Sequence, residues 1–203
     1  MNQTLSIIKR EHGNLRAVLY SLQALADDLA NKGAQADFKA FHAILTYVDT
    51  FIHQFHHPKE DLHLFPVLKR RYPEAESLLA DLEDDHERGT ALLNELRRAL
   101  SIYEFRGDRA LPEFCKAVDA YITFERDHAR KEELELFPLA EAHLKEEDWE
   151  KIYNAFADNN DPVFGDKPRK EFETLHTTIV NLIPSPYGVG PAWGSDAGNR
   201  KAQ

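Results

Sequence analysis

The sequence predicts an all-α protein: an up-down-up-down four-helix bundle with a short helical extension at its C-terminal end. Apolar residues recur at intervals of three and four along four long stretches, and strand-like alternation is nowhere sustained. Short segments rich in glycine or proline separate these stretches, as antiparallel neighbouring helices require. The chain has 203 residues, of which 42% are apolar, enough for the core of one domain.

The first two helices are predicted on either side of Gly33. An apolar stretch covers residues 5–25, and the helix is expected to end near Gly33, a residue typical of helix C-caps. The second stretch begins after Asp37. Pro58 lies inside it, and because proline lacks a backbone N–H, we expect it to kink or locally widen this helix. The same property of Pro66 is expected to end the helix shortly afterwards.

The third and fourth helices are also delimited by prolines. Pro73 suits the first turn of the third helix, which is expected to end at the turn 106–108. Pro112 opens the fourth helix, and we expect an interruption at Pro138 like that in the second helix. The four helices form one predicted bundle domain, residues 1–145.

The remainder of the chain has a different character. Residues 146–183 are predicted to form a helical extension packed on the bundle, beginning with an amphipathic helix that buries Trp149 and Phe156. A second helix is expected at residues 169–182. Proline, glycine and serine cluster without periodicity in residues 184–203, so we expect an extended or disordered tail there.

Composition excludes several classes of partner. A net charge of −10 leaves no broad basic surface of the kind that nucleic-acid binding requires. No run approaches the roughly 20 apolar residues of a membrane span, and the first residues lack the basic and then apolar order of a secretory signal. Cys115 is the single cysteine, which excludes an internal disulfide and indicates a reducing compartment. We therefore expect a cytoplasmic protein with no nucleic-acid or membrane partner.

One spacing of histidine and glutamate occurs in both halves of the chain. A lone histidine precedes a His-x-x-x-Glu pair by 44 residues in one half, from His12 to His56, and by 42 in the other, from His86 to His128. His-x-x-x-Glu places an imidazole and a carboxylate one turn apart on the same helix face. The six residues of the two patterns are His12, His56, Glu60, His86, His128 and Glu132.

The loop positions indicate that these six side chains meet. The two histidines of the first half are 21 and 23 residues from Gly33, and those of the second half are each 21 residues from Gly107. In antiparallel helices joined at those glycines, all four histidines lie at one height, about 30 Å from the turns. Four imidazoles and two carboxylates at one level predict a site for two metal ions, whose charge would neutralise the two buried carboxylates.

The residues themselves leave the metal open. Imidazole and carboxylate ligands without thiolate suit iron, manganese or zinc and do not suit calcium. A ferritin-like site is an alternative, because Glu-x-x-His occurs on three of the predicted bundle helices, at residues 60–63, 83–86 and 125–128. That architecture needs the motif on two helices and lone glutamates on the other two, so the His-x-x-x-Glu repeat explains more residues.

Further polar residues lie near the six in the sequence. His57 follows a predicted ligand and is an additional candidate ligand, whereas His63, one turn after Glu60, is expected to line the pocket or support the site. His53 and Glu125 are expected to orient the histidine ligand one turn further along their helices through outer hydrogen bonds. Three histidines are interpreted as structural or surface residues: His42, His143 and His176.

The ligand segments resemble those of a known family. Phe-His-His-Pro-Lys-Glu-Asp at residues 55–61, with Leu-Phe-Pro at 64–66, is similar to the hallmark of hemerythrin-like (HHE cation-binding) proteins. His-Ala-Arg-Lys-Glu-Glu at 128–133, with Leu-Phe-Pro at 136–138, matches it again, and the resemblance covers residues 4–143. It implies a hemerythrin-like bundle that holds two iron ions in an oxo- or hydroxo-bridged non-haem centre. The implied bridges are Glu60 and Glu132, and the implied terminal ligands are His12, His56, His86 and His128.

The sequence departs from the oxygen-carrying members of that family at one point. Those proteins add a fifth histidine one turn from the third-helix ligand, where this chain has Leu82 and Thr90. The set of four histidines and two glutamates instead resembles proteins that repair damaged iron–sulfur centres and relatives that act on peroxide or NO. The repair proteins usually carry a small Cys-bearing N-terminal domain, and this chain begins at its first bundle helix. A generic di-iron assignment is therefore favoured over either specific function.

Three functions remain open at this stage. We expect a di-iron protein that binds or reacts with a small oxidant (O₂, H₂O₂ or NO) in stress defence or iron-centre repair, because six ligands leave open positions on two ions. If it is an enzyme, its chemistry is di-iron redox chemistry on these molecules. The alternative is an oxygen- or iron-sensing module whose extension, with Trp149 and Trp193, acts on a protein partner. Lastly, the metal could serve only to stabilise the bundle. The sequence assigns no general acid or base.

Overall fold

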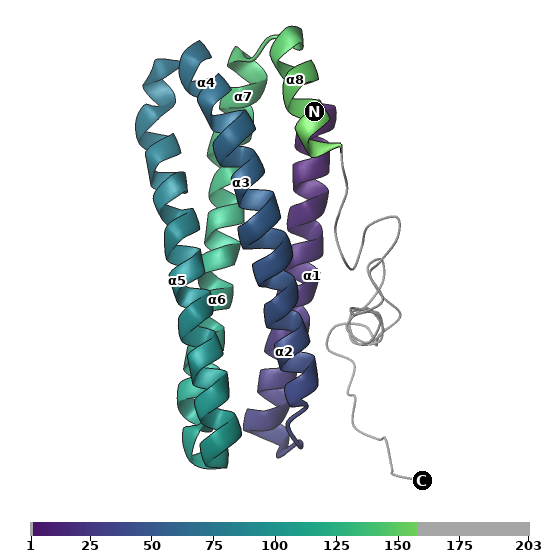
Figure 1. The fold of residues 1–203 in the computed structure, drawn as a ribbon, viewed down its shortest axis with the longest axis vertical. Helices are drawn as coiled ribbons and strands as arrows, with labels where there is room; N and C mark the ends of the chain where they lie inside the picture. The colour runs from purple at the N-terminus through teal and green to yellow at the C-terminus, as the bar shows by residue number, and fades with distance from the viewer. Residues whose placement is uncertain (1, 158–203) are drawn as a thin grey trace.

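The computed structural model describes residues 2–157 and confirms the predicted all-α bundle, with four helical columns side by side (Figure 1). The first column is α1 (Gln3–Lys32). The second consists of α2 (Phe38–Tyr47), η1 (Val48–His56), α3 (His57–Lys59), η2 (Glu60–Leu64) and α4 (Phe65–Arg71). The third consists of η3 (Pro73–Ala75) and α5 (Glu76–Arg106). The fourth consists of η4 (Gly107–Ala110), α6 (Leu111–Lys131), η5 (Glu132–Leu136) and α7 (Phe137–His143).

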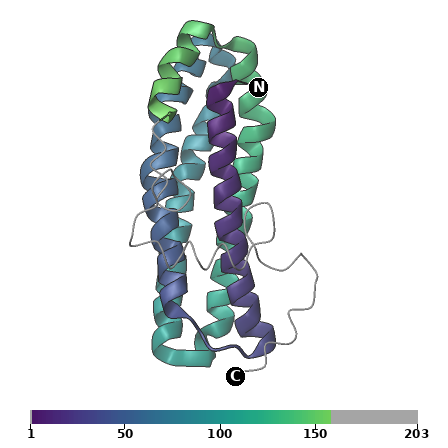
Figure 2. The same ribbon diagram turned by 90° about the vertical axis from the view of Figure 1, so that its right-hand side faces the viewer.

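The column ends follow from local chemistry, as predicted. Gly33 adopts the left-handed conformation, with φ of 60°, and ends α1. The Asp37 side chain then accepts a hydrogen bond from the N–H of Ala40 and caps α2. Figure 2 shows this connection at the end of the bundle opposite the N-terminus. Gly107 ends α5 and also has a positive φ, 63°, but its ψ of −152° differs from the left-handed helical conformation of Gly33.

The predicted helix ends at Pro66 and Pro138 are wrong. The second column continues to Arg71 and the fourth to His143. Before each proline lies a π-helical turn, in which Phe65 or Phe137 donates its N–H to the carbonyl five residues earlier. A proline in a regular α-helix lacks a donor and clashes with the carbonyl four residues back. The π turn shifts the hydrogen-bond register by one residue, so the helix passes the proline.

The expected widening of the second column at Pro58 is present. A π-helical segment, η1, ends at His56, and the N–H of His57 donates to the carbonyl of Ile52, five residues earlier. Short π-helical segments are frequent at functional sites. In this protein they lie in the second and fourth columns, where the predicted His-x-x-x-Glu pairs are found.

Two apolar clusters occupy the interior, one on each side of a polar layer. The cluster nearer the Gly33 and Gly107 turns contains Leu22, Phe51, Leu96 and Tyr121, among others, and the cluster at the other end contains Ile8, Leu68 and Phe156. Buried polar side chains separate them. The layer contains Glu11, His12, His56, His57, Glu60, His86, Glu125, His128 and Glu132.

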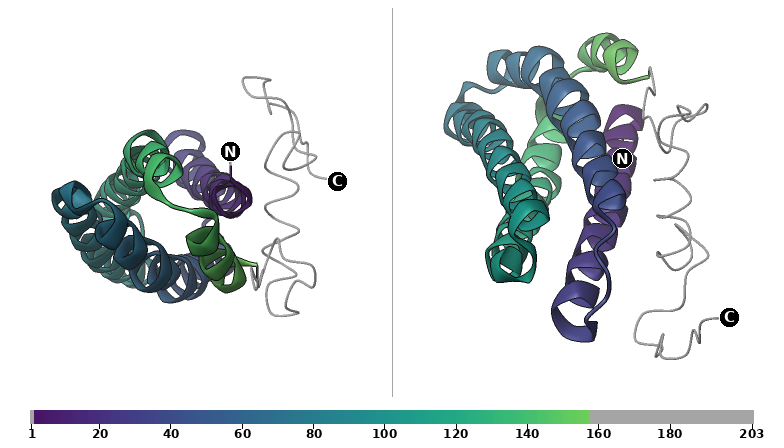
Figure 3. Two further views of the ribbon diagram at one scale, coloured as in Figure 1. Left: turned by 90° about the horizontal axis from the view of Figure 1, so that it is seen from above. Right: turned by 60° about the horizontal axis from the view of Figure 1, so that its bottom comes forward.

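The predicted extension begins as a helix. α8 (Glu146–Phe156) lies next to α1 at the N-terminal end of the bundle (Figure 3) and buries Trp149 and Phe156 as expected. Arg71 of α4 donates two hydrogen bonds to the Asp148 carboxylate. The rest of the predicted extension, the helix at 169–182 and the tail at 184–203 lie outside the described residues. None of the described helices has the length and apolar character needed to cross a membrane.

Candidate metal centre

Glu132 lies at the centre of the polar layer. Its Oε2 atom is 2.9 Å from Nε2 of His12. Its Oε1 atom is 3.3 Å from Nε2 of His128 and 3.8 Å from Nε2 of His86. One carboxylate oxygen thus faces the histidine of α1, and the other faces the histidines of α5 and α6. A carboxylate that bridges two ions has this arrangement.

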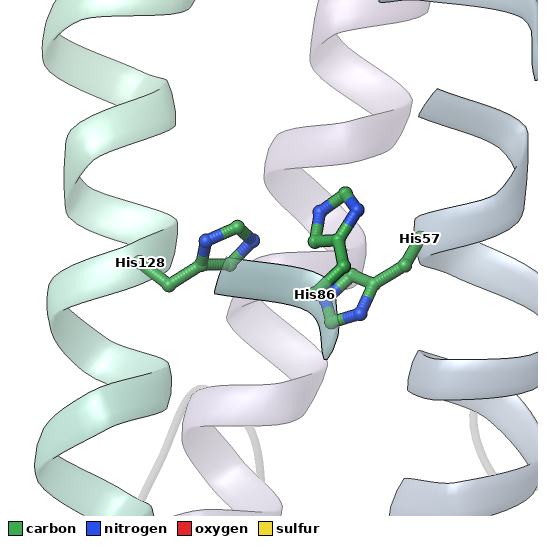
Figure 4. Close-up of side chains that lie close together, drawn as sticks. All are labelled: His57, His86 and His128. Carbon is green, nitrogen blue, oxygen red and sulfur yellow. The ribbon is translucent and has the colours of Figure 1, made fainter. Parts of the chain in front are cut away.

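Glu60 also faces histidines of two different columns. Its Oε2 atom is 3.7 Å from Nε2 of His56 and 3.7 Å from Nε2 of His86. The six side chains predicted from the repeat therefore converge from all four columns. They form two groups, within each of which the ligand atoms lie within 4.8 Å of one another. One group is His12, His56, Glu60 and Glu132; the other is His86 and His128, joined by His57 (Figure 4).

The chemistry of these residues fits a metal cation. Both glutamates are 0% exposed. Among the described residues, neither carboxylate has a hydrogen-bond partner of adequate geometry, and the same holds for Nε2 of His12, His86 and His128. Burying polar atoms in this state is costly. A cation between nitrogen and oxygen atoms would satisfy all of them together, so the residues fit the proposed pair of ions.

The two glutamates titrate in opposite directions in the metal-free protein. Burial, followed by the negative charges of Glu132 and Glu11, raises the pKa of Glu60 well above its usual value. Burial also opposes ionisation of Glu132, but the histidines around it outweigh burial and lower its pKa well below the usual value. In the metal-free layer Glu60 therefore holds a proton more tightly than Glu132, which favours the ionised form.

Each of the four predicted histidine ligands turns its other ring nitrogen, Nδ1, towards a carboxylate. Three Nδ1 atoms donate a hydrogen bond of 2.8–3.0 Å, and the fourth, that of His128, is 3.8 Å from its carboxylate. The pairs are His12 with Glu133, His56 with Glu11, His86 with Asp61, and His128 with Asp85. Such partners hold the ring so that Nε2 points at the metal.

The four carboxylates form a cycle around the bundle. Each is the sequence neighbour of a predicted ligand in its own column, yet it faces the histidine of the next column. Glu11 of the first column faces the second, and Asp61 of the second faces the third. Asp85 of the third faces the fourth, and Glu133 of the fourth faces the first. The cycle couples the orientation of every ring to the packing of two columns.

Removal of one of these carboxylates tests their role. Glu11→Gln keeps the side-chain volume but removes the charge that holds the Nδ1–H of His56, so we expect metal affinity to fall about 10- to 100-fold. A competition titration with a chelator of known affinity measures the change. Glu141→Gln is the matched control, because Glu141 is an exposed glutamate of α7 outside both ligand groups, and it should leave the affinity unchanged. Equal affinities for all three proteins would contradict an orienting role.

The orienting roles predicted for His53 and Glu125 are wrong, since the carboxylate cycle fills them. Nε2 of His53 is instead hydrogen-bonded to the Tyr121 hydroxyl at 3.0 Å and lies 3.7 Å from Oε1 of Glu125. Glu125 is fully buried, and burial raises its pKa to about 7. Gly89 leaves room for it, because a Cβ atom there would lie 2.9 Å from Glu125 Oε1. These residues form a second polar cluster against the ring of His57.

The positions of the remaining histidines bear on the ferritin-like alternative and on the predicted surface roles. His63 and Glu83 are exposed, so the Glu-x-x-His segments at 60–63 and 83–86 do not direct complete pairs into the layer, and the structure does not favour ferritin-like ligation. His42 is exposed beside Glu104, and His143 stacks on a tyrosine, which agrees with structural or surface roles. His176 lies outside the described residues.

A cavity leads to the layer from the side of α3 and α5. Its volume is about 400 Å³. The lining includes His53, His57, Pro58, Asp61, His86 and Thr90. Because His57 and His86 belong to both the cavity wall and the second histidine group, a small molecule could approach the centre by this route.

Comparison with known proteins identifies the domain type. The family model described as Hemerythrin HHE cation binding domain matches residues 3–140, which is more than half of the chain and includes the six residues of the repeat. No curated protein and no solved structure gave a match. The match, the group of three histidines and the group of two histidines and two glutamates together indicate a domain that binds metal cations.

Proposed function

Because the chain belongs to the hemerythrin HHE cation-binding family, we propose that it binds two iron ions and that this centre binds or reacts with a small oxidant: O₂, H₂O₂ or NO. The main support for two ions is the pair of buried glutamates, Glu60 and Glu132, each of which faces histidines of different columns. Under this proposal His12 and His56 hold one ion, and His86 and His128 hold the other. Glu60 and Glu132 bridge the two.

The donor set and its surroundings support iron and a small ligand. Imidazole and carboxylate without thiolate is a set that non-haem iron accepts, and iron supplies the redox chemistry that an oxidant needs. Apolar clusters close the layer at both ends, which leaves the cavity beside α3 and α5 as the described approach. A cavity of about 400 Å³ admits diatomic molecules and peroxide readily. A cytoplasmic location, expected from the lone cysteine, is part of the same proposal.

Metal analysis combined with optical spectroscopy tests the proposal. Protein loaded with Fe(II) under anaerobic conditions should contain two irons per chain. Exposure to O₂ or H₂O₂ should produce absorption of an oxo-bridged ferric pair, and NO should produce a separate spectral change in the reduced protein. Protein that holds two irons but responds to none of these three molecules would refute the reaction with oxidants while leaving metal binding intact.

Iron affinity should depend on pH. Burial opposes protonation of His12 and His86, but their carboxylate neighbours outweigh it and raise each pKa to about 9. At neutral pH these imidazoles hold protons that iron must displace, so apparent affinity should rise with pH up to about pH 9. Each released proton contributes up to about tenfold per pH unit. Calorimetry in buffers of different ionisation enthalpy measures the protons released; affinity that falls with pH would contradict the assignment.

A sensing role is a second candidate, favoured by the position of α8. This helix contacts both α1 and η2, the π-helical turn that begins at Glu60. A change of metal state at Glu60 therefore has a direct route to the surface of α8. Comparing size-exclusion and partner-binding profiles of metal-loaded and metal-free protein tests this candidate, and identical profiles would argue against it.

A further inference from the structure

His57 is a buried imidazole beside the second histidine group. Its residue is 4% exposed, and its Nδ1 atom has no hydrogen-bond partner among the described residues. The ring stacks on that of His86, with centroids 4.0 Å apart and planes 9° from parallel. It meets the ring of His128 nearly at right angles, with centroids 5.2 Å apart. Figure 4 shows the three rings gathered between α3, α5 and α6.

His57 and His128 are arranged like the predicted ligand pairs, whereas His57 lies closer to His86. The rings of His12 and His56 have centroids 5.2 Å apart, and those of His86 and His128 are 4.8 Å apart. His57 stands at 4.0 and 5.2 Å from the latter two. One nitrogen atom from each of the three residues lies within 4.8 Å of the others. The interplanar angle of His57 and His128, 75°, is close to the 77° and 72° of the two ligand pairs, and His57 also stacks on His86.

The π-helical backbone explains how two successive residues face the interior. In a regular α-helix, His57 would point about 100° away from His56. The N–H of His57 instead bonds the carbonyl of Ile52, which widens the turn and reduces the angle between successive side chains. His56 then belongs to one ligand group and His57 to the other.

The surroundings of His57 supply no other reason to bury an imidazole. Its ring neighbours are four other imidazoles: His53, His56, His86 and His128. In the part of the chain that the structure describes, no carboxylate lies within ion-pair distance of it. An unpaired polar atom in such a place costs free energy, whereas a shared cation stabilises it.

We propose that His57 is a third nitrogen ligand of the ion held by His86 and His128. The inference rests on the proposed function and deepens it. Seven side chains then hold the pair, with three imidazoles on one ion and two on the other, so the ions differ chemically. The extra nitrogen comes from the second column; Thr90 on the third column has no nitrogen in its side chain, and its hydroxyl donates to the His86 carbonyl of its own helix.

Iron binding by His57→Ala tests the proposal, with Thr90→Ala as the matched control. Both residues line the same cavity, but only His57 offers a nitrogen. We expect wild type and Thr90→Ala to bind two irons and to give two Mössbauer doublets of equal area. His57→Ala should lose affinity for one ion by roughly 100-fold or more, above the effect of removing an orienting partner. Added imidazole should enter the cavity and restore the second iron.

The outcomes separate this inference from the proposed function. Two irons in His57→Ala, with wild-type affinity and doublets, would overturn the inference and leave the di-iron proposal standing. Fewer than two irons in the wild type would refute the di-iron proposal itself. If His57→Ala lacks wild-type helix content by circular dichroism, the same comparison is made with His57→Gln, which keeps a polar side chain of similar size. Restoration of the second iron by imidazole in either variant supports ligation directly.

Discussion

Replacing Glu132 by alanine is expected to remove both iron ions. Its two oxygens face different histidines, Oε2 towards His12 and Oε1 towards His86 and His128, so one substitution removes a ligand from each proposed ion. We expect the iron content to fall from two per chain towards zero and the affinity of each site to fall by more than roughly 100-fold, the upper effect of removing an orienting partner. Metal analysis after equilibrium dialysis measures both.

Glu135→Ala is the matched control for this substitution. Glu135 lies in the same π-helical turn, η5, but its side chain is exposed. This variant should keep two irons and the wild-type spectrum. If Glu132→Ala retained one tightly bound iron, Glu132 would be a ligand of a single ion and the bridging assignment would fail.

Removing the metal is expected to lower the thermal stability of the bundle substantially. A ligand that binds only the folded state stabilises it by about 4 kcal/mol when its free concentration is 1,000 times Kd, so two ions contribute roughly 8 kcal/mol. At about 2–4 °C per kcal/mol for a domain of this size, Tm should fall by roughly 15–30 °C on chelation. Scanning calorimetry of iron-loaded and chelated protein measures the shift.

The Glu132→Ala variant provides an internal control for the chelation experiment. It should melt at the same temperature with and without chelator, because it holds no iron to lose. An unchanged Tm in the wild-type protein would show that bound metal does not couple the four columns, contrary to the placement of its ligands on all of them.

Helix positions were predictable where one residue fixes the local backbone. Gly33 and Gly107 take positive φ, and Pro73 opens a helix, in each case for reasons confined to a few neighbouring residues. The helix ends predicted at Pro66 and Pro138 were wrong because a π turn before each proline lets the helix continue past it. A one-residue shift in hydrogen-bond register is confined to one turn, and the three-and-four periodicity on either side of it does not reveal it.

The candidate site was predictable as far as repetition and helix geometry allow. The six residues of the His-x-x-x-Glu repeat could be placed at one level by counting from two glycines. The carboxylate cycle was missed, although Glu11 and Asp85 precede the lone histidines and Asp61 and Glu133 follow the paired glutamates. Their adjacency is visible in the sequence, but each faces a histidine of another column, and only the packed bundle reveals that pairing.

The role of His57 also could not be predicted from the sequence alone. The 100° step of a regular helix places it off the ligand face, so the sequence left its role open. The backbone around it is π-helical, and this brings its ring against that of His86. Local backbone geometry of this kind depends on how Pro58 is accommodated in the packed column.

X-ray diffraction from crystals of the iron-loaded protein, recorded on both sides of the iron absorption edge, would locate the bound ions and so test the proposed di-iron centre. Two anomalous peaks a few ångströms apart are expected inside the polar layer. One should lie at Nε2 of His12 and His56 and the other at His86 and His128, with Glu60 and Glu132 between them. A single peak, or peaks away from these six side chains, would contradict it.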